Sequence, residues 1–296
     1  MKGKVPPLLA IRALKILVFI STCALGACFA ATILTENQSD EQENPLGSLP
    51  EPLGKESSGL INQATLVMGV DEGGFNTDSI FILEAGEIQS CLTQVPRDGR
   101  VFNSVGDSIK INSMYGSTGI DATKLSLSNL TGKAIANHLV VDLNAVIELA
   151  DILGGIEINV PKKMYYVDNA QELYIDLEPG IQILLAEDLE GFLRWRADSS
   201  GDYGRMSRQQ TVIQAAIDKI RFSPDEDLFF KLISLALQKT NTNLSAIEML
   251  NVLKYLKSSS ISMASLASEP LLKNRVWYQI VDWKDDLGLL KGCTPK

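Results

Sequence analysis

Four arginines lie close together near residue 200 in a chain whose formal net charge is −9. They fall within fifteen positions, and a glycine-containing stretch separates the first pair from the second: Arg194, Arg196, Arg205 and Arg208. The planar guanidinium group pairs bidentately with phosphate oxygens and keeps its charge, so arginine suits a pyrophosphate better than lysine does. The spacing therefore favours a site that binds a phosphate-rich molecule.

The second arginine pair lies beside the start of a helix that the apolar spacing predicts for residues 207–221. If the helix begins there, its first turn holds Arg205, Arg208 and Gln209, and the free backbone N–H groups and the helix dipole also favour an anion. A competing interpretation is that the arginines form surface ion pairs with Asp198, Asp202 and neighbouring helices. The segment by itself does not decide between the two.

Two further arginines, Arg97 and Arg100, follow a predicted strand at residues 88–95. Sites in α/β folds commonly lie at strand ends, so these two side chains are candidates for the same phosphate-binding site. Taken alone, the segment 96–100 is also typical of a turn.

Two aspartates flank a short loop between strands predicted at residues 65–70 and 79–83. Asp71 follows the first strand, and Asp78 precedes the second. Mg²⁺ typically takes one or two protein carboxylates and fills its remaining positions with substrate phosphates and water. The pair is therefore a candidate Mg²⁺ site, and the alternative is that the two side chains only cap the loop.

Composition and missing motifs exclude several classes of protein. From residue 35 onward the chain has 23 basic against 36 acidic residues, a balance of −13, so it is no general nucleic-acid binder. HExxH, Walker A and GxGxxG patterns are absent, as are cysteine pairs with metal-ligand spacing. His138 is the only histidine, and we interpret it as a structural residue at the start of a strand.

Short β-branched runs alternate with longer helical patterns, which is typical of an α/β layered fold. We expect one domain from residue 60 to 296, in which helices cover a mixed sheet. A helix is expected after Asp121, which can cap an N-terminus. The remaining expected elements are strands at 138–141, 156–160 and 276–282, and helices at 143–153, 207–221, 224–237 and 244–256.

The N-terminus combines four basic residues with a long uncharged segment. The uncharged run at residues 16–34 is 19 residues long, close to the roughly 20 that a helix needs to cross a bilayer. The basic residues place the tail 1–15 in the cytoplasm, which predicts a single-pass protein of the cytoplasmic membrane with an extracytoplasmic domain. Signal-peptide cleavage near residues 27–31 and lipoprotein processing at Cys28 are competing interpretations. Residues 35–59 are too polar to pack and are expected to form a flexible linker.

Four cysteines are present, and two of them, Cys23 and Cys28, lie in the predicted membrane segment. Cys91 and Cys293 would then face an oxidising compartment. They either form a single disulfide or remain separate, and their distance in the sequence does not decide which.

Together these segments make the chain resemble the LytR-CpsA-Psr family of cell-wall ligases over residues 62–220, more than half of the chain. The matching motifs are Gly69-Val70-Asp71, Thr77-Asp78-Ser79, Pro96-Arg97-Asp98-Gly99-Arg100, Lys110-Ile111-Asn112, Leu153-Gly154-Gly155-Ile156 with Val160-Pro161, and the highly specific block from Arg194 to Gln209. The resemblance implies an α/β/α sandwich with a mixed central sheet, preceded by one transmembrane helix. It also implies a hydrophobic pocket for a polyprenyl chain and an arginine-lined mouth for its pyrophosphate.

The resemblance further implies a reaction, in which a Mg²⁺-dependent enzyme transfers a phosphoglycan from a polyprenyl pyrophosphate carrier onto peptidoglycan and releases polyprenyl phosphate. The implied partners are the lipid-linked donor, the peptidoglycan acceptor and the membrane, with no nucleic acid. Asp71 and Asp78 would hold Mg²⁺, and Asp202 would support the arginine loop. The substrate-binding residues would be Arg97, Arg100, Arg194, Arg196, Arg205, Arg208 and Gln209. Asp98 and Asp198 are the nearest candidates for a general base.

Three departures from the family pattern bear on activity. Asn76 stands where the family usually has arginine, Gly99 replaces the usual threonine, and Leu-Ala-Glu-Asp at residues 185–188 replaces Leu-Asp-Gly-Glu. The missing positive donor at position 76 is expected to weaken pyrophosphate binding or to change which donor lipid is accepted. Two alternatives to an enzyme follow, namely a module that binds polyprenyl phosphate without transferring anything, and a membrane-bound envelope regulator.

Overall fold

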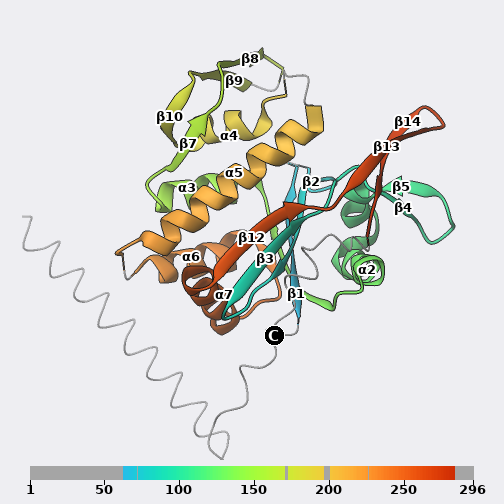
Figure 1. Ribbon diagram of the computed structural model, residues 1–296, viewed down its shortest axis with the longest axis horizontal. Helices are drawn as coiled ribbons and strands as arrows, with labels where there is room; N and C mark the ends of the chain where they lie inside the picture. Colours follow the sequence, from blue (N-terminus) through green and yellow to red (C-terminus); the bar gives the residue numbers. More distant parts are fainter. Residues whose placement is uncertain (1–62, 72, 171–172, 197–200, 226, 284–296) are drawn as a thin grey trace, which may run out of the picture. The chain divides into compact units, whose positions relative to one another are not determined.

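A mixed sheet of six strands lies at the centre of a computed structural model of the chain, which describes residues 63–71, 73–170, 173–196, 201–225 and 227–283 (Figure 1). The six strands are β1 (Ala64–Val70), β2 (Thr77–Glu84), β3 (Gln89–Gln94), β6 (Ile135–Val141), β11 (Asn241–Thr242) and β12 (Ser260–Ser265). Their order is β11-β6-β1-β2-β3-β12. The pairs β1–β6 and β3–β12 are parallel, and the other three pairs are antiparallel.

Alternating side chains of β1 and β2 enter two different cores. Leu66, Met68 and Ile80 belong to the core on one face of the sheet. Val67 and Phe81 belong to a second cluster on the other face. Because successive strand residues point to opposite faces, both faces of the sheet are covered. The strands predicted for β1, β2, β3 and β6 are confirmed, with ends that shift by up to three residues.

Helix α2 (Met114–Thr131) covers the first face, beside the 3-10 turn η1 (Ile111–Ser113) and the hairpin of β4 (Arg100–Phe102) and β5 (Ser108–Lys110). The helix begins before the predicted start at Asp121 and is kinked at Gly119, where φ is 81°. Asp121 lies inside it and pairs with Lys124 at 3.1 Å. The helix expected after Asp121 is therefore confirmed, because a second helical segment starts directly after the non-helical Gly119, but Asp121 lies in its first turn and does not cap it.

A further core lies among α3 (Leu143–Ile152), α4 (Ala186–Arg194), α5 (Gly201–Phe222) and two small hairpins. The hairpin strands are β7 (Ile156–Val160) with β10 (Gly180–Leu184), and β8 (Met164–Asp168) with β9 (Leu173–Leu177). The predicted helix and strand at α3 and β7 are confirmed, and Asp142 caps α3 by accepting a hydrogen bond from Ala145 N at 2.8 Å. The other three strands were missed because exposed Tyr165 and Ile181 break the apolar–polar alternation.

Two more helices and a final hairpin complete the described part of the chain. Helices α6 (Leu228–Lys239) and α7 (Ala246–Ser258) confirm the predictions, although their starts and ends lie two to four residues later. Ser245 and Glu248 form a capping box at the start of α7. The expected late strand is β14 (Val276–Val281), which pairs with β13 (Ser268–Lys273), and neither β12 nor β13 was predicted.

The architecture is thus an α/β fold with flanking helices, as the sequence indicated. The predicted tail, membrane segment and linker lie outside the described residues. No helix within the described residues is long and apolar enough to cross a bilayer. Cys91 is buried in β3 and disulfide-bonded. Because Cys293 lies outside the described ranges, its pairing with Cys91 stays a prediction.

Candidate functional site

Asp78 occupies a bulge near the start of β2. The β1–β2 pairing steps from Gly69 opposite Ser79 to Val70 opposite Thr77, so Asp78 is the extra residue. Such a bulge re-aims one side chain out of the regular alternation. Ser79 Oγ accepts a hydrogen bond from Gly69 N at 3.1 Å, and a Cβ atom on Gly69 would lie 2.5 Å from that oxygen. Glycine at this position therefore permits the close approach beside the bulge.

Three guanidinium groups converge on Oδ1 of Asp78. It lies 2.8 Å from Nη1 of Arg97, 3.0 Å from Nη1 of Arg205 and 3.8 Å from Nη2 of Arg196. Asp202 completes the cluster, because its Oδ1 lies 3.1 Å from Arg97 Nε and 2.7 Å from Arg205 Nη2. Five predicted site residues are therefore brought together, and three positive charges meet two negative ones. The excess positive charge suits an anionic ligand.

Arg205 is the buried member of this arginine–aspartate cluster, with a side chain only 3% exposed. Burial lowers its pKa from 12.5 to about 10, and the nearby charge of Arg97 acts in the same direction, while Asp202 acts to raise it. Arg205 therefore stays protonated at neutral pH. Its Nε atom is buried and finds no hydrogen-bond partner among the described residues. A buried donor of this kind needs an explanation, and an oxyanion is a chemically suitable acceptor.

Backbone hydrogen bonds fix the loop that carries Arg97. Its carbonyl oxygen accepts from Asn112 N at 3.0 Å, and Gly99 O accepts from Ile111 N at 2.8 Å. A Cβ atom on Gly99 would lie 2.9 Å from Pro96 O, so the glycine that replaces the usual threonine allows tight packing here. Arg97 is thus held on a loop with little freedom to move.

Asp98, one of the two general-base candidates, does not lie within the arginine–aspartate cluster. Asp98 forms an ion pair with Lys110, and the two charged atoms lie 3.1 Å apart. Asp198 lies outside the described residues. The role of general base is therefore left unassigned.

Two arginines of the predicted block support the surrounding chain instead of binding Asp78 or Asp202. Arg194, the last residue of α4, pairs with Glu190 one turn earlier at 2.6 Å. Arg208 is buried, donates from Nη2 to the carbonyl oxygen of Trp195, and lies over the Trp195 ring at 5.3 Å. Arg208 therefore fixes the backbone that leads into Arg196.

Arg100 is likewise outside the cluster. Its Nε donates to Ser108 Oγ at 2.9 Å, and its guanidinium carbon lies 4.8 Å from the centre of the Phe102 ring. These contacts stay within the β4–β5 hairpin. Of the two arginines predicted at this strand end, the structure brings only Arg97 to the cluster.

Hydrogen-bonded glutamines of β3 and α5 support the cluster. Gln209 donates to the backbone oxygen of Asp78 at 3.2 Å and accepts from Gln94 Nε2 at 2.9 Å. Gln210 donates to Gln94 Oε1 at 2.8 Å. Gln94 and Gln210 were not predicted, and the one signal in the sequence was a polar residue near the end of a predicted strand, shortly before Arg97.

Helix α5 begins at Gly201, not at residue 207 as predicted. Its first turn holds Asp202, whose negative charge the helix dipole favours there. The prediction that Arg205, Arg208 and Gln209 occupy the first turn is therefore wrong. The free N–H groups of that turn do not lie beside these side chains to help bind an anion. The glycine-containing start of the segment reads as a loop in sequence, which explains the error.

Asp71, at the other end of the β1–β2 loop, is held by Asn76. Its Oδ2 accepts from Asn76 Nδ2 at 3.1 Å, and its Oδ1 accepts from the backbone N–H groups of Asn76 and Phe75 at 3.2 and 3.0 Å. Burial acts to raise the pKa of Asp71, but these hydrogen bonds outweigh it and leave the pKa below 3.8. Asp71 is therefore charged at neutral pH, and neutral Asn76 does not cancel that charge.

The two aspartates fit Mg²⁺ only with help from a ligand. No group of three or more acidic, histidine or cysteine side chains in the described ranges could hold a metal ion. Mg²⁺, however, commonly takes one or two carboxylates and completes its shell with phosphate oxygens. Asp71 suits this role because it makes no ion pair among the described residues, whereas Asp78 shares one oxygen with the arginines.

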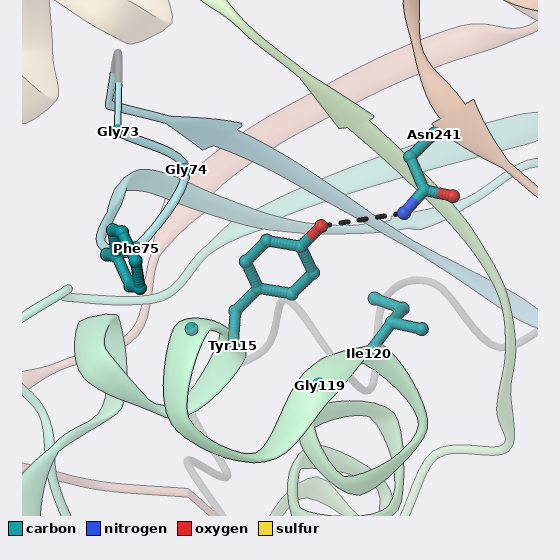
Figure 2. A pocket seen from close by; sticks show the side chains of 8 residues that line it. Gly73, Gly74, Phe75, Tyr115, Gly119, Ile120 and Asn241 are labelled. Atoms are coloured by element: carbon teal, nitrogen blue, oxygen red, sulfur yellow. Dashed lines mark hydrogen bonds between the residues drawn. The ribbon is translucent and has the colours of Figure 1, made fainter.

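A separate pocket of about 340 Å³ lies between the loop after Asp71 and helix α2 (Figure 2). Gly116 allows the two to approach closely, because a Cβ atom there would lie 2.3 Å from Phe75 O. Asn241 Nδ2 and the Tyr115 hydroxyl approach to 3.5 Å across it. No predicted site residue lines this pocket; its lining consists of residues 73–75, Tyr115, Gly116, Gly119, Ile120 and Asn241.

The fold and the cluster together define an α/β domain with a cluster of arginines and aspartates at one end of a mixed sheet. The chain belongs to the LytR_cpsA_psr family, which matches residues 30–289. The family resemblance seen in the motifs is thereby confirmed.

Individual relatives carry two kinds of name. The polyisoprenyl-teichoic acid–peptidoglycan teichoic acid transferase TagV of Bacillus subtilis is 28% identical over 164 residues, which cover 53% of this chain and 41% of TagV. The regulatory protein MsrR of Staphylococcus aureus is 30% identical over 156 residues, covering 50% of this chain and 46% of MsrR. The chain thus spans about half the length of these curated relatives.

Solved structures show the same fold. The crystal structure of B. subtilis TagV matches with a TM-score of 0.65 at 23% identity, over 74% of this chain and 91% of TagV. The structure of TagT bound to LIIa-WTA matches with a TM-score of 0.60 at 18% identity, over 74% of this chain and 84% of TagT.

Proposed function

We propose that this chain transfers a phosphoglycan from a polyprenyl pyrophosphate carrier onto peptidoglycan and releases polyprenyl phosphate. The proposal rests on the convergence of Arg97, Arg196 and Arg205 around Asp78, with more positive than negative charge. Fixed guanidinium groups suit a pyrophosphate, which carries several negative charges. The family membership, the transferase name of TagV and the TagT structure with LIIa-WTA support the same class of reaction here.

One bond forms and one breaks at phosphorus in this reaction. The acceptor hydroxyl oxygen bonds to the phosphorus that carries the glycan, and the bond from this phosphorus to the bridging oxygen breaks. The bridging oxygen leaves with polyprenyl phosphate, and the hydroxyl proton passes to a base or to the leaving phosphate. Arg97 and Arg205 would stabilise the negative charge that develops on the leaving phosphate.

Asp78 and Asp202 position these two arginines. Arg205 contacts both carboxylates through separate nitrogens, and so does Arg97. A guanidinium held at two points presents its remaining N–H groups in fixed directions. Donors that are fixed before the substrate arrives need no reorganisation during the reaction, which is the main source of electrostatic catalysis.

Mg²⁺ is part of the proposal, and Asp71 and Asp78 would hold it together with phosphate oxygens. When bound, the ion would neutralise charge on the pyrophosphate. Asn76 favours this role because it orients Asp71 without cancelling its charge. An arginine at position 76 would instead compete with the metal for the same carboxylate.

We further propose that the domain lies on the outer face of the cytoplasmic membrane, tethered by the predicted segment 16–34. The uncharged run and the basic residues before it support this orientation. A polyprenyl carrier is a membrane lipid, so a tether would keep the site near its donor.

The test is release of polyprenyl phosphate from a synthetic donor by the full chain in detergent, with peptidoglycan fragments as acceptor and Mg²⁺ present. We expect acceptor-dependent release that falls by about 100-fold or more in Arg97→Gln, because a fixed donor is lost. Arg100→Gln is the matched comparison and should stay close to wild type, since Arg100 contacts Ser108 and Phe102 instead.

Two results would count against transfer. Equal rates for wild type and Arg97→Gln would show that the cluster is not the reacting site. Bound polyprenyl phosphate detected by mass spectrometry, without any release from the donor, would favour the lipid-binding module that Asn76 motivates.

A further inference from the structure

Two hairpins present large apolar side chains to solvent near their tips. In β13–β14, Leu272 and Trp277 are directly opposed across the two strands and are 54% and 59% exposed. In β4–β5, Phe102 and Val105 are 57% and 78% exposed. Exposed apolar side chains that gather at one place, unlike scattered ones, mark interaction sites.

The two hairpins lie side by side at their bases and diverge toward their tips, as the right-hand side of Figure 1 shows. The Tyr278 hydroxyl donates to Ser108 O at 3.2 Å, and Lys273 Nζ lies 3.4 Å from Ser108 Oγ. Tyr278 is buried by this packing, whereas Trp277, which points to the opposite face of the hairpin, is not. The tip of β13–β14 thus presents Leu272 and Trp277 on the face turned away from β4–β5, and together with Lys273 and Arg275 they form the hairpin-tip surface.

The turn of β13–β14 places positive charge on a strained backbone. Asn274 and Arg275 have φ values of 51° and 64°, as in a two-residue type I′ turn. Glycine is favoured at the second position because a side chain is sterically disfavoured at positive φ. Arg275 and Lys273 give the tip two positive charges, and residues 270–281 contain no acidic residue. This local balance contrasts with the net charge of −9 for the chain.

The arginine–aspartate cluster lies near the base of the same hairpins. Gln279 of β14 forms a bridge to Gly99, and its backbone N–H donates to Asp98 O at 2.8 Å, one residue from Arg97. Its side-chain oxygen accepts from the Tyr203 hydroxyl at 3.2 Å, next to Asp202 in α5. From Gln279 to Arg275 in the turn is four residues, or roughly 13 Å of strand. The hairpins therefore connect the tips to the site by a short, hydrogen-bonded path.

We propose that the hairpin-tip surface docks on the interface of a bilayer that contains anionic lipid. Tryptophan prefers the level of the headgroups, and lysine and arginine are attracted to anionic lipids. The chain as a whole is acidic and is repelled by such a surface, whereas the β13–β14 tip carries Lys273 and Arg275 and no acidic residue, so this tip is the part that meets it.

A tether alone would not set this orientation. Residues 35–63 lie between the predicted membrane segment and β1, and 29 residues reach up to roughly 100 Å when fully extended. Such a length allows any face of the domain to meet the membrane. Docking through the hairpins selects one face and holds the arginine–aspartate cluster close to the lipid surface.

The test uses the full chain reconstituted in vesicles of equal parts phosphatidylcholine and phosphatidylglycerol, with bromine on the acyl chains to quench nearby tryptophan. We expect quenching in wild type, with at least half of it lost in Trp277→Ser, because Trp195 and Trp283 remain in both proteins. Tyr165→Ser, an exposed aromatic residue on the β8–β9 hairpin, is the matched control and should quench like wild type. Equal quenching in wild type and Trp277→Ser would overturn the proposal.

Arg275→Gly separates docking from folding. Glycine suits the positive φ at this position, so the variant should melt at the wild-type temperature or higher while its quenching falls several-fold. Unchanged quenching in this variant, or in vesicles of phosphatidylcholine alone, would overturn the role of anionic lipid. A self-association that Trp277→Ser abolishes, with quenching unchanged, would overturn docking and assign the surface to a second copy. The vesicles contain no donor lipid, so the result does not depend on the proposed transfer reaction.

Discussion

At the scale of single residues, Asn76 and Asp71 decide how the charged loop after β1 behaves. Three hydrogen bonds from residues 75 and 76 reach the Asp71 carboxylate, and all of them favour its charged form. An arginine at position 76 would add a positive charge, whereas asparagine orients the carboxylate through hydrogen bonds without adding charge. The residue that departs from the family pattern thus keeps the carboxylate oriented and negatively charged.

We expect Asn76→Arg to weaken Mg²⁺ binding in the proposed reaction. The new cation would pair with Asp71 and compete with the metal, so the Mg²⁺ concentration for half-maximal release should rise roughly tenfold, equivalent to about 1.4 kcal/mol. Asn169→Arg adds the same charge at an exposed position in the β8–β9 hairpin and should leave the Mg²⁺ titration unchanged. A titration that Asn76→Arg does not shift would remove Asp71 from the metal site.

The lowered pKa of Asp71 also predicts a pH dependence of stability. Because the folded-state pKa lies below 3.8, the stabilisation is complete above that value and is lost as the pH falls through the folded-state pKa. Asn76→Ala removes the side-chain hydrogen bond and should reduce this acid-dependent loss. Free energies of unfolding in urea at about pH 5 and about pH 3 would measure this loss, and the effect is small because Asp71 is only partly buried. Identical losses in the two proteins would contradict the assignment.

At the scale of elements, sequence predicts those whose signals are local. Strand β7 and helix α3 follow from the spacing of their apolar residues, and both appear where expected. The start of α5 and the hairpins β8–β9 and β13–β14 could not be predicted from such local signals. Glycine in a first turn and large side chains on an outer strand face contradict the usual patterns, and packing overrides local propensity there.

The same distinction applies to the site. The spacing of the charged residues together with the family resemblance predicted Arg97, Arg196, Arg205, Asp78 and Asp202, and the structure brings them together. Contacts between residues that lie far apart in the chain could not be predicted from the sequence. One example is the hydrogen bond between Gln94 and Gln209, which are 115 positions apart. For the same reason, nothing in the sequence separated Arg100, Arg194 and Arg208 from the arginines that meet the aspartates.

The start of α4 offers a stability prediction at the element scale. Ala186 has a φ of 33°, which is strained for any residue with a Cβ atom. Ala186→Gly should raise the free energy of unfolding by about 1 kcal/mol, as measured in urea. Ala215→Gly, inside α5, should lower it by about the same amount, because glycine disfavours a helix interior. A loss of stability in Ala186→Gly would show that the strain is not relieved.

At the scale of the whole molecule, the proposed tether should matter only when the donor is in a membrane. A chain that starts at residue 35 keeps every described element, so its rate on a water-soluble short-chain donor should match the full chain. Its rate on donor embedded in vesicles should fall by about tenfold or more, because the effective concentration at the surface is lost. Equal rates on vesicles would contradict the tether, and unequal rates on the soluble donor would point to a folding defect.

Helix α5 connects the two halves of the described fold. Its residues Val212 and Ala216 lie in the core with α3 and α4, while Ile213 packs on the central sheet. The ion pairs from Arg205 and Asp202 of this helix to Asp78 and Arg97 add a polar connection across the same boundary.

The connection that α5 and its ion pairs make between the two halves of the fold has a consequence for genetics. Removing Asp78 would deprive the buried guanidinium of Arg205 of a counter-charge and loosen the helix from the sheet, so the variant protein would unfold more often. Cells degrade chains that unfold often, and abundance can fall several-fold for a modest loss of stability. A cell-wall defect in a strain with such a variant would then reflect a low amount of the protein. The amount must therefore be measured by immunoblotting before a growth phenotype is assigned to lost activity.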